Sequence, residues 1–136
     1  MKLDEFGVHF IEGGWPASNP KDLEYFRLVG EYRLSHAKVV AFTSTRRKDL
    51  RVEEDPGVRE VLRSGVDVAA VVGSASKFHV EKVLRTSLET NLDMVKDTVG
   101  YLADHGIKVV FDAEHFFDGY KSSPDYAMSV VKAAEK

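Results

Sequence analysis

Short apolar runs rich in valine alternate along this chain with longer stretches in which apolar residues recur at helical spacing. The short runs predict β-strands, because they contain many β-branched residues and are too short for typical helices. They span Val8–Glu12, Lys38–Thr43, Val66–Val72 and Ile107–Ala113. Strands of nearly continuous apolar character, separated by helices, are typical of a parallel sheet with right-handed crossovers.

Helical stretches occupy the intervals between these runs. The predicted helices are Asn19–Arg33, a short helix from Pro56 to near Gly65, the long stretch Val80–His105, and Pro124–Lys136. An N-cap residue followed by proline is typical of a helix start, and three such pairs occur, at Asn19-Pro20, Asp55-Pro56 and Ser123-Pro124. Glycines lie where helix C-termini are expected, each just before a strand: Gly7, Gly65 and Gly106.

The alternation predicts an α/β fold and a single domain over residues 1–136, without an internal linker. Four strands are about half of a (β/α)8 barrel, which needs about 250 residues. Met1–Phe6 has the stop signal of a helix without a start, and the last residues are helical without a cap. We therefore predict a partial (β/α)8 TIM barrel with about four parallel strands and flanking helices. A small open α/β domain is the alternative.

The composition and charge of the chain exclude several classes of protein. The 136 residues include 19 Lys plus Arg against 22 Asp plus Glu, for a net charge of −3. This mild acidity argues against a nucleic-acid-binding surface. The absence of cysteine excludes a disulfide framework and thiolate chemistry. No apolar run approaches the ~20 residues of a membrane span, and no signal-peptide core follows Met1. We expect a soluble, cytoplasmic protein without nucleic-acid or membrane partners.

Candidate reactive groups follow the strands, because parallel α/β folds collect such groups at the carboxyl ends of their strands. Glu12 ends the first predicted strand and is followed by Gly13 and Gly14. A carboxylate beside two glycines fits a site where a ligand approaches the backbone closely. The alternative is that the glycines only make a turn and Glu12 is solvated.

The last strand carries the densest group of polar side chains. Asp112 and Glu114 alternate onto one face of the strand, and His115 follows directly. Two carboxylates at this spacing suggest an acid–base group or oxygen ligands for a hard cation such as Mg²⁺. An exposed polar strand end, with the following aromatic residues packing a loop, is the alternative.

The second strand ends in hydroxyl groups beside cations. The segment Thr43–Lys48 could hold a carboxylate or phosphate group, and a solvated charge run is the alternative. The histidines give no local metal site, because no two of them are spaced i, i+2 or i, i+4. His79 and His115 follow strands and remain candidate functional groups.

At these segments the sequence resembles a known family. Gly7–Asp22 resembles the second strand and following loop of citramalate synthases, which belong with the α-isopropylmalate and homocitrate synthases to the HMG-CoA-lyase-like, metal-dependent barrels. Ala41–Arg47 resembles their third strand end, and Leu84–Leu92 their fourth helix. Asp112–Lys121 is the most specific match. The resemblance covers the whole chain and implies strands two to five of the barrel.

The resemblance implies an acyltransferase of branched-chain amino-acid biosynthesis. Such enzymes condense acetyl-CoA with an α-keto acid, either pyruvate to give citramalate or 2-oxoisovalerate to give 2-isopropylmalate. A divalent metal (Mg²⁺, Mn²⁺ or Zn²⁺) polarises the keto oxygen, a base removes a methyl proton from the thioester, and the carbanion attacks. By position, the catalytic candidates are Glu12 and Glu114, and the substrate-binding candidates are Ser44, Arg46, Asp112 and His115.

Two motifs of the family do not occur in this sequence. These are an Asp-x-x-Leu-Arg-Asp-Gly motif on the first strand and a His-x-His pair that binds the metal. We therefore expect that this chain is a fragment of the synthase, that it binds no metal tightly and is inactive alone, and that its open sheet forms a homo-oligomer. The alternatives are a non-catalytic half-barrel for binding or oligomerisation, and an α/β domain with an unrelated ligand.

Overall fold

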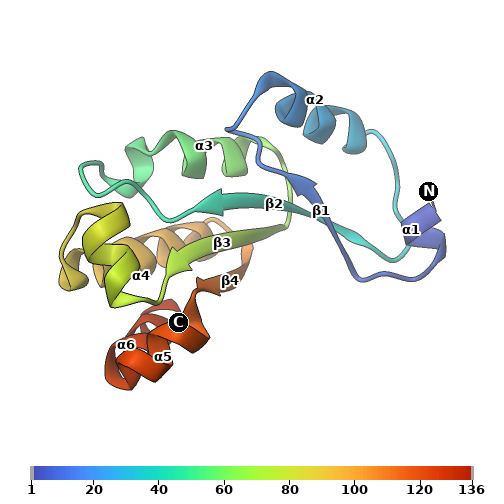
Figure 1. Cartoon of the computed structure of the whole chain (residues 1–136). Helices are drawn as coiled ribbons and strands as arrows, with labels where there is room; N and C mark the ends of the chain where they lie inside the picture. Colours follow the sequence, from blue (N-terminus) through green and yellow to red (C-terminus); the bar gives the residue numbers. More distant parts are fainter. Residues whose placement is uncertain (1, 136) are drawn as a thin grey trace.

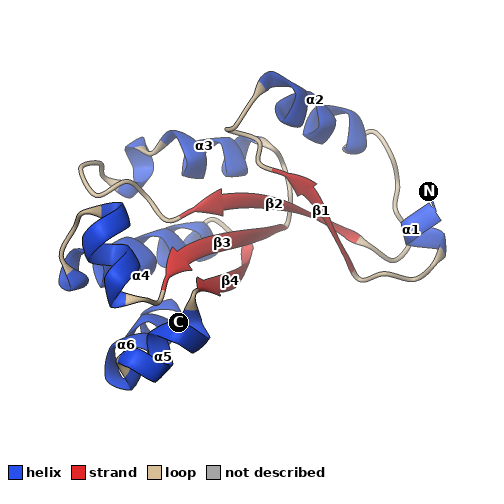
Figure 2. Cartoon of the chain, in the orientation of Figure 1, coloured by secondary structure: helices blue, strands red, loops and turns tan. Residues whose placement is uncertain are grey.

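Four parallel strands form one sheet in the computed structural model, which describes residues 2–135 (Figures 1 and 2). The strands are β1 (Phe10–Gly14), β2 (Lys38–Ser44), β3 (Val68–Ser74) and β4 (Lys108–Glu114), and their order in the sheet is their order in the chain. The predicted α/β class and the parallel pairing are confirmed. β1, β3 and β4 begin one or two residues later than predicted and end one or two residues later.

Helices connect the strands and lie along the outside of the sheet (Figure 1). The α-helices are α1 (Lys2–Glu5), α2 (Pro20–Val29), α3 (Pro56–Arg63), α4 (Leu88–Asp104), α5 (Phe116–Ser122) and α6 (Pro124–Ala134). A 3-10 turn, η1 (Val52–Glu54), precedes α3, and a π-helix, η2 (His79–Leu84), follows β3. No helix within residues 2–135 has the length and apolar character that a bilayer span requires.

One face of the sheet is buried beneath the helices. Small strand residues, Ala41 and Ala69, let the helices approach closely, and Phe26 of α2 and Leu102 of α4 pack against them. A second buried cluster lies under the last helix, where α6 packs on α4. These two clusters contain most of the buried apolar side chains, so the helical face supplies most of the stability of the fold.

Within residues 2–135, no helix covers the opposite face of the sheet, and this face curves inward. Val40, Val68 and Ala70 are buried there, whereas Val110 is 46% exposed. The Lys108 ammonium of β4 lies 5.4 Å from the centroid of the Phe10 ring on β1. Because three strand spacings separate β1 from β4 by about 14 Å in a flat sheet, this contact indicates that the uncovered face is concave.

The helix starts are partly as predicted. The Asn19 side chain accepts from the amide of Asp22, and Asp55 accepts from the amides of Gly57 and Val58, as N-caps do. Ser123 makes no side-chain cap, so its predicted capping role is wrong. The predicted C-terminal glycines all adopt positive φ angles of 73–85° at Gly7, Gly65 and Gly106.

The long helix predicted over Val80–His105 is wrong as a continuous element. Arg85 adopts a left-handed conformation (φ 53°) and ends the π-helix, and the Ser87 hydroxyl then accepts from the amide of Thr90 to begin α4. Apolar spacing continues across the break, which is why periodicity concealed it. No helix was predicted between the last strand and Pro124, but the structure forms α5 there.

Candidate active site at the carboxyl ends of the strands

The carboxyl ends of β2, β3 and β4 bring several predicted residues to one edge of the concave face. Ser44 of β2 is in register with Val72, and Val72 with Asp112 of β4. Neighbours in register point to the same side of a sheet, so Ser44 and Asp112 share the concave face about 10 Å apart. Glu114 is in register with Ser74 one step further along. The structure therefore brings together the candidates on β2 and β4.

Glu114 is the last residue of β4, and His115 follows it directly. The Glu114 side chain is 52% exposed, and its carboxylate oxygen Oε1 lies 3.9 Å from Nε2 of His115. His115 has a left-handed backbone (φ 59°), which turns the chain from β4 into α5. A non-glycine residue in this conformation is strained by about 1–3 kcal/mol, and such residues concentrate at functional sites.

The His115 ring also contacts a second histidine. Its centroid lies 3.7 Å from that of His79, which is the first residue of the π-helix after β3. Donor atoms of His79, Glu114 and His115 all lie within 4.8 Å of one another, so these three side chains could hold a metal ion. Local spacing could not reveal this group, because the two histidines are 36 positions apart. They come together because β3 and β4 are neighbours and each histidine follows its strand.

Glu12 lies on the same concave face as Glu114, but the two residues do not belong to the same row of register partners across the sheet. Its register partner is Val40, whose row continues through Val68 to Lys108 at the start of β4. Glu114 is six residues beyond Lys108, about 20 Å along the strand. Glu12 is exposed, and it shares with Glu114 the concave face rather than a direct contact.

Gly13 and Gly14 serve the packing of β1 on α2. A Cβ atom at Gly13 would overlap the Tyr25 ring, and Gly14 has a φ of 111° beside the Asp22 carboxylate. The Asp22 carboxylate accepts from the amide of Trp15, and this hydrogen bond is the main reason that the pKa of Asp22 lies below its usual value. Both glycines therefore serve the packing of β1 on α2, and they lie within the strand rather than in the turn that the alternative interpretation expected.

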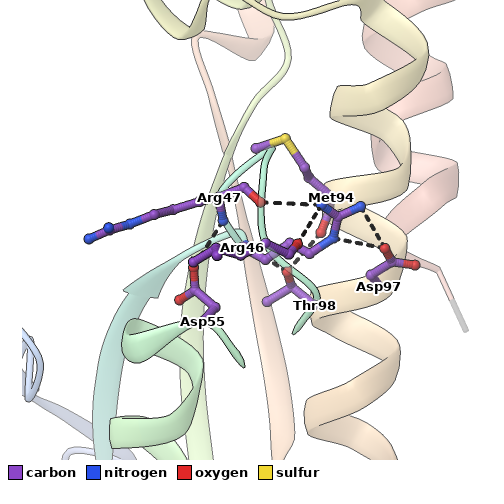
Figure 3. Close-up of polar contacts among 7 residues, drawn as sticks. Arg46, Arg47, Asp55, Met94, Asp97 and Thr98 are labelled. Carbon is purple, nitrogen blue, oxygen red and sulfur yellow. Dashed lines mark hydrogen bonds and ion pairs between the residues drawn. The ribbon is translucent and has the colours of Figure 1, made fainter. Parts of the chain in front are cut away.

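Arg46 is held by the protein itself (Figure 3). Its Nε and Nη2 atoms each lie 2.8 Å from Oδ2 of Asp97 on α4, and Nη1 donates to the carbonyls of Arg47 and Leu50. The side chain is only 12% exposed. These contacts tie the loop after β2 to α4, so the guanidinium donors of Arg46 point into the fold.

Arg47 is the exposed cation beside Ser44, and sequence reasoning did not single it out. Its amide donates to Asp55, while its side chain extends away from the Arg46 contacts (Figure 3). Arg47, Ser44 and Trp15 help to line a cavity of about 300 Å³. Because adjacent Arg46 and Arg47 are chemically alike, only the tertiary contact with Asp97 distinguishes the buried one from the free one.

A buried amide supports the end of β3. Asn91 of α4 is fully buried, and its Nδ2 donates to the carbonyl of Ser74 at 3.0 Å and to the hydroxyl of Tyr126 at 2.9 Å. Burial raises the pKa of the Tyr126 hydroxyl above its ordinary value, so this group stays neutral. The carboxyl edge of β3, beside Glu114, is thereby fixed to both α4 and α6.

Comparison with known proteins now identifies the fold. The HMGL-like family model matches residues 1–136. The chain belongs to the HMGL-like family. It is 48% identical to the (R)-citramalate synthase of Sulfolobus acidocaldarius over 136 residues, all of this chain and 26% of that protein. It is 50% identical to the Streptomyces coelicolor (R)-citramalate synthase over 98% of this chain and 25% of the relative.

More distant relatives have other names. The 2-isopropylmalate synthase of Methanocaldococcus jannaschii is 31% identical over 98% of this chain, which covers 24% of that protein. The chain thus spans about a quarter of the length of the curated relatives that it matches. The resemblance stated from the sequence is confirmed, and the four parallel strands with their helices form part of an HMGL-like barrel.

HMGL-like enzymes depend on a divalent metal. The motifs that supply the metal ligands in the family do not occur in residues 1–136. The His79, Glu114 and His115 donors come from the ends of β3 and β4 instead. These residues do not match the family's metal site.

Proposed function

We propose that this chain forms part of the catalytic barrel of a citramalate-type acyltransferase, which condenses acetyl-CoA with pyruvate. The observation that carries the proposal is the difference in similarity between two groups of relatives. Identity is 44–50% with five (R)-citramalate synthases and 31% with the 2-isopropylmalate and homocitrate synthases. The acyl transfer would serve branched-chain amino-acid biosynthesis.

Glu114 is the proposed acid–base group of the reaction. Its carboxylate stands at the carboxyl end of β4 on the concave face, where half of the side chain is open to a ligand. A carboxylate in this position can accept a proton from the methyl group of a bound thioester, provided that the thioester lies within hydrogen-bonding reach. His115, 3.9 Å from Glu114, would position the carboxylate.

The neighbouring polar groups are proposed to bind the substrates. Asp112 lies two positions before Glu114 on the same face of the sheet, and Ser44 lies in the same row as Asp112. Both could hydrogen-bond to the polar ends of the acyl acceptor. Glu12 would contribute a second carboxylate lower on the concave face. Arg46 is proposed to position the loop that follows Ser44, because Asp97 already binds its guanidinium.

A chimeric enzyme tests this proposal. The matching segment of the Sulfolobus acidocaldarius synthase is replaced by this chain, and CoA release is measured with acetyl-CoA and either pyruvate or 2-oxoisovalerate. We expect turnover with pyruvate and at least about tenfold less with 2-oxoisovalerate, which is within the range for discrimination by small apolar groups. The control variant Asp118→Asn, at a side chain that is 85% exposed on α5, should retain this activity.

Two results would contradict the proposal in different ways. Preference for 2-oxoisovalerate would refute the citramalate assignment and leave acyl transfer in place. A folded chimera that releases no CoA with either keto acid would refute the acyltransferase itself.

The non-catalytic alternative has its own test. The absence of the two family motifs from residues 1–136 favours a chain that binds substrates without turning them over when alone. We propose that the isolated chain releases no CoA from acetyl-CoA and pyruvate. Measurable turnover by the purified 136-residue chain would overturn this expectation.

A further inference from the structure

We propose that His79, Glu114 and His115 form a binding site for a transition-metal ion such as Zn²⁺. The three side chains come from the ends of two neighbouring strands, and their donor atoms lie within 4.8 Å of one another. The centroids of the two imidazole rings lie 3.7 Å apart with a tilt of 33° between the rings, and the Glu114 carboxylate oxygen Oε1 lies 3.9 Å from Nε2 of His115. This site differs from the family's metal site in every ligand.

The distances allow coordination once the donor atoms close in and the two stacked imidazole rings, tilted by 33°, rotate so that an in-plane nitrogen lone pair of each points at the ion. A point equidistant from three atoms that are 4.8 Å apart lies about 2.8 Å from each of them. Zinc–nitrogen and zinc–oxygen bonds measure about 2.0–2.2 Å, so each donor atom has to move by less than about 1 Å. Glu114 and His115 are 52% and 40% exposed, which leaves their side chains room to rotate toward an ion.

The donor types select the metal. Two imidazole nitrogens with one carboxylate oxygen form a three-ligand set that zinc uses when it keeps a fourth position open. Imidazole also suits other late transition ions, whereas Mg²⁺ prefers oxygen ligands and retains its water. We therefore expect Zn²⁺ and Co²⁺ to bind here and Mg²⁺ not to compete with them.

An ion at this site would restrain Glu114. If Glu114 has the acid–base role proposed above, bound Zn²⁺ takes its carboxylate out of proton transfer and inhibits the enzyme. This consequence rests on the proposed function, but the binding site itself does not. Binding is therefore measured without acetyl-CoA or keto acid, so that failure of the site and failure of the proposed function can be told apart.

The test uses the whole 136-residue chain. Co²⁺ is titrated at neutral pH and followed by its visible absorption, and Zn²⁺ affinity is obtained by competition and by calorimetry. We expect one ion per chain and a tetrahedral Co²⁺ spectrum. His79→Asn, His115→Asn and Glu114→Gln should each weaken binding at least about tenfold, as expected for loss of a ligand. Asn at position 115 tolerates the left-handed backbone.

His105→Asn is the matched control. His105 ends α4, where its Nδ1 contacts the carbonyl of Tyr101. The His105→Asn variant should bind Co²⁺ and Zn²⁺ with the same affinity as the unchanged chain. Thermal unfolding without metal verifies that each variant is folded. The proposal is overturned if neither ion binds, or if His79→Asn and His115→Asn, both folded, bind as tightly as the control.

Discussion

A single hydroxyl fixes the loop after β2 to the longest helix. Thr98 of α4 is fully buried, and its Oγ1 accepts from the amide of Arg46 at 2.8 Å while donating to the carbonyl of Met94 at 2.7 Å. The first bond holds the segment that follows β2 against α4, and the second fixes the Thr98 hydroxyl within the helix. Side-chain chemistry alone did not predict this, since threonine at a helix position has no necessary partner outside the helix.

Replacing this hydroxyl by a methyl group gives the first prediction. Thr98→Val keeps the shape of the side chain but leaves the Arg46 amide without its acceptor, which should lower the free energy of unfolding by about 1–3 kcal/mol. Thr98→Ser, which retains the hydroxyl, is the matched control and should be clearly more stable than the valine variant. Urea denaturation measures both, and equal stability of the two variants would refute the assigned role.

Gly119 of α5 occupies a second position at which the packing explains the residue type. A Cβ atom there would overlap the carbonyl oxygen of Ala75 and lie 2.9 Å from its carbon. Gly119→Ala should therefore destabilise the chain by about 1–3 kcal/mol, since α5 has to move. Gly30→Ala is the control, because its Cβ would meet no atom closer than 3.5 Å and its φ is −62°. If thermal unfolding finds both variants equally stable, the close approach of α5 to Ala75 is wrong.

At the scale of elements, local signals predicted most of the fold. The valine-rich runs, the Asn19 and Asp55 caps and the three glycines with positive φ are decided by nearby residues, and all are confirmed. The break at Arg85 and the helix α5 were missed. Both depend on tertiary contacts: the π-helix packs Val80 into the core, and α5 fits because Gly119 approaches Ala75.

Asp4 of α1 joins the first helix to the segment before β2. Its carboxylate accepts from the backbone amides of Ser35, His36 and Ala37 at 2.8–2.9 Å. These bonds, that of Ala37 foremost, lower the pKa of Asp4 from 3.8 to about 2. The carboxylate is thus favoured in the folded state, and its contribution to stability is complete above about pH 4.

This linkage predicts a pH dependence. As the pH falls from about 4 to about 2, the unfolded state takes up the proton first, so the stabilisation by Asp4 is lost across that range. Asp4→Asn should be less stable near neutral pH, and the difference from the unchanged chain should shrink toward pH 2. Thermal unfolding between pH 2 and pH 6 measures the difference. A gap that stays constant or widens on acidification would contradict the low pKa.

At the scale of the whole molecule, the sheet has two open edges. Within residues 2–135, β1 and β4 each pair on one side only, and the concave face between them exposes Val110 and Phe10. Open edges and exposed apolar faces favour association. We predict that the 136-residue chain self-associates, with a concentration-dependent mass in light scattering. A monomer across the micromolar to millimolar range would contradict this prediction.

The candidate site was predictable only in part. Asp112 and Glu114 are two positions apart in sequence, so strand alternation placed both on one face of β4, and His115 follows directly. The partnership with His79 depends on which strand lies beside β4, and the engagement of Arg46 depends on Asp97. Neither is contained in local spacing, because both join segments more than 30 positions apart.

The most direct measurement concerns Glu114. In the chimeric synthase that carries this chain, Glu114→Gln preserves size and removes the carboxylate charge at the carboxyl end of β4. If Glu114 is the acid–base group, kcat for CoA release with acetyl-CoA and pyruvate should fall at least about 100-fold, while Asp118→Asn leaves it unchanged. A Glu114→Gln chimera that is folded and keeps the kcat of its parent would contradict the role assigned to this carboxylate.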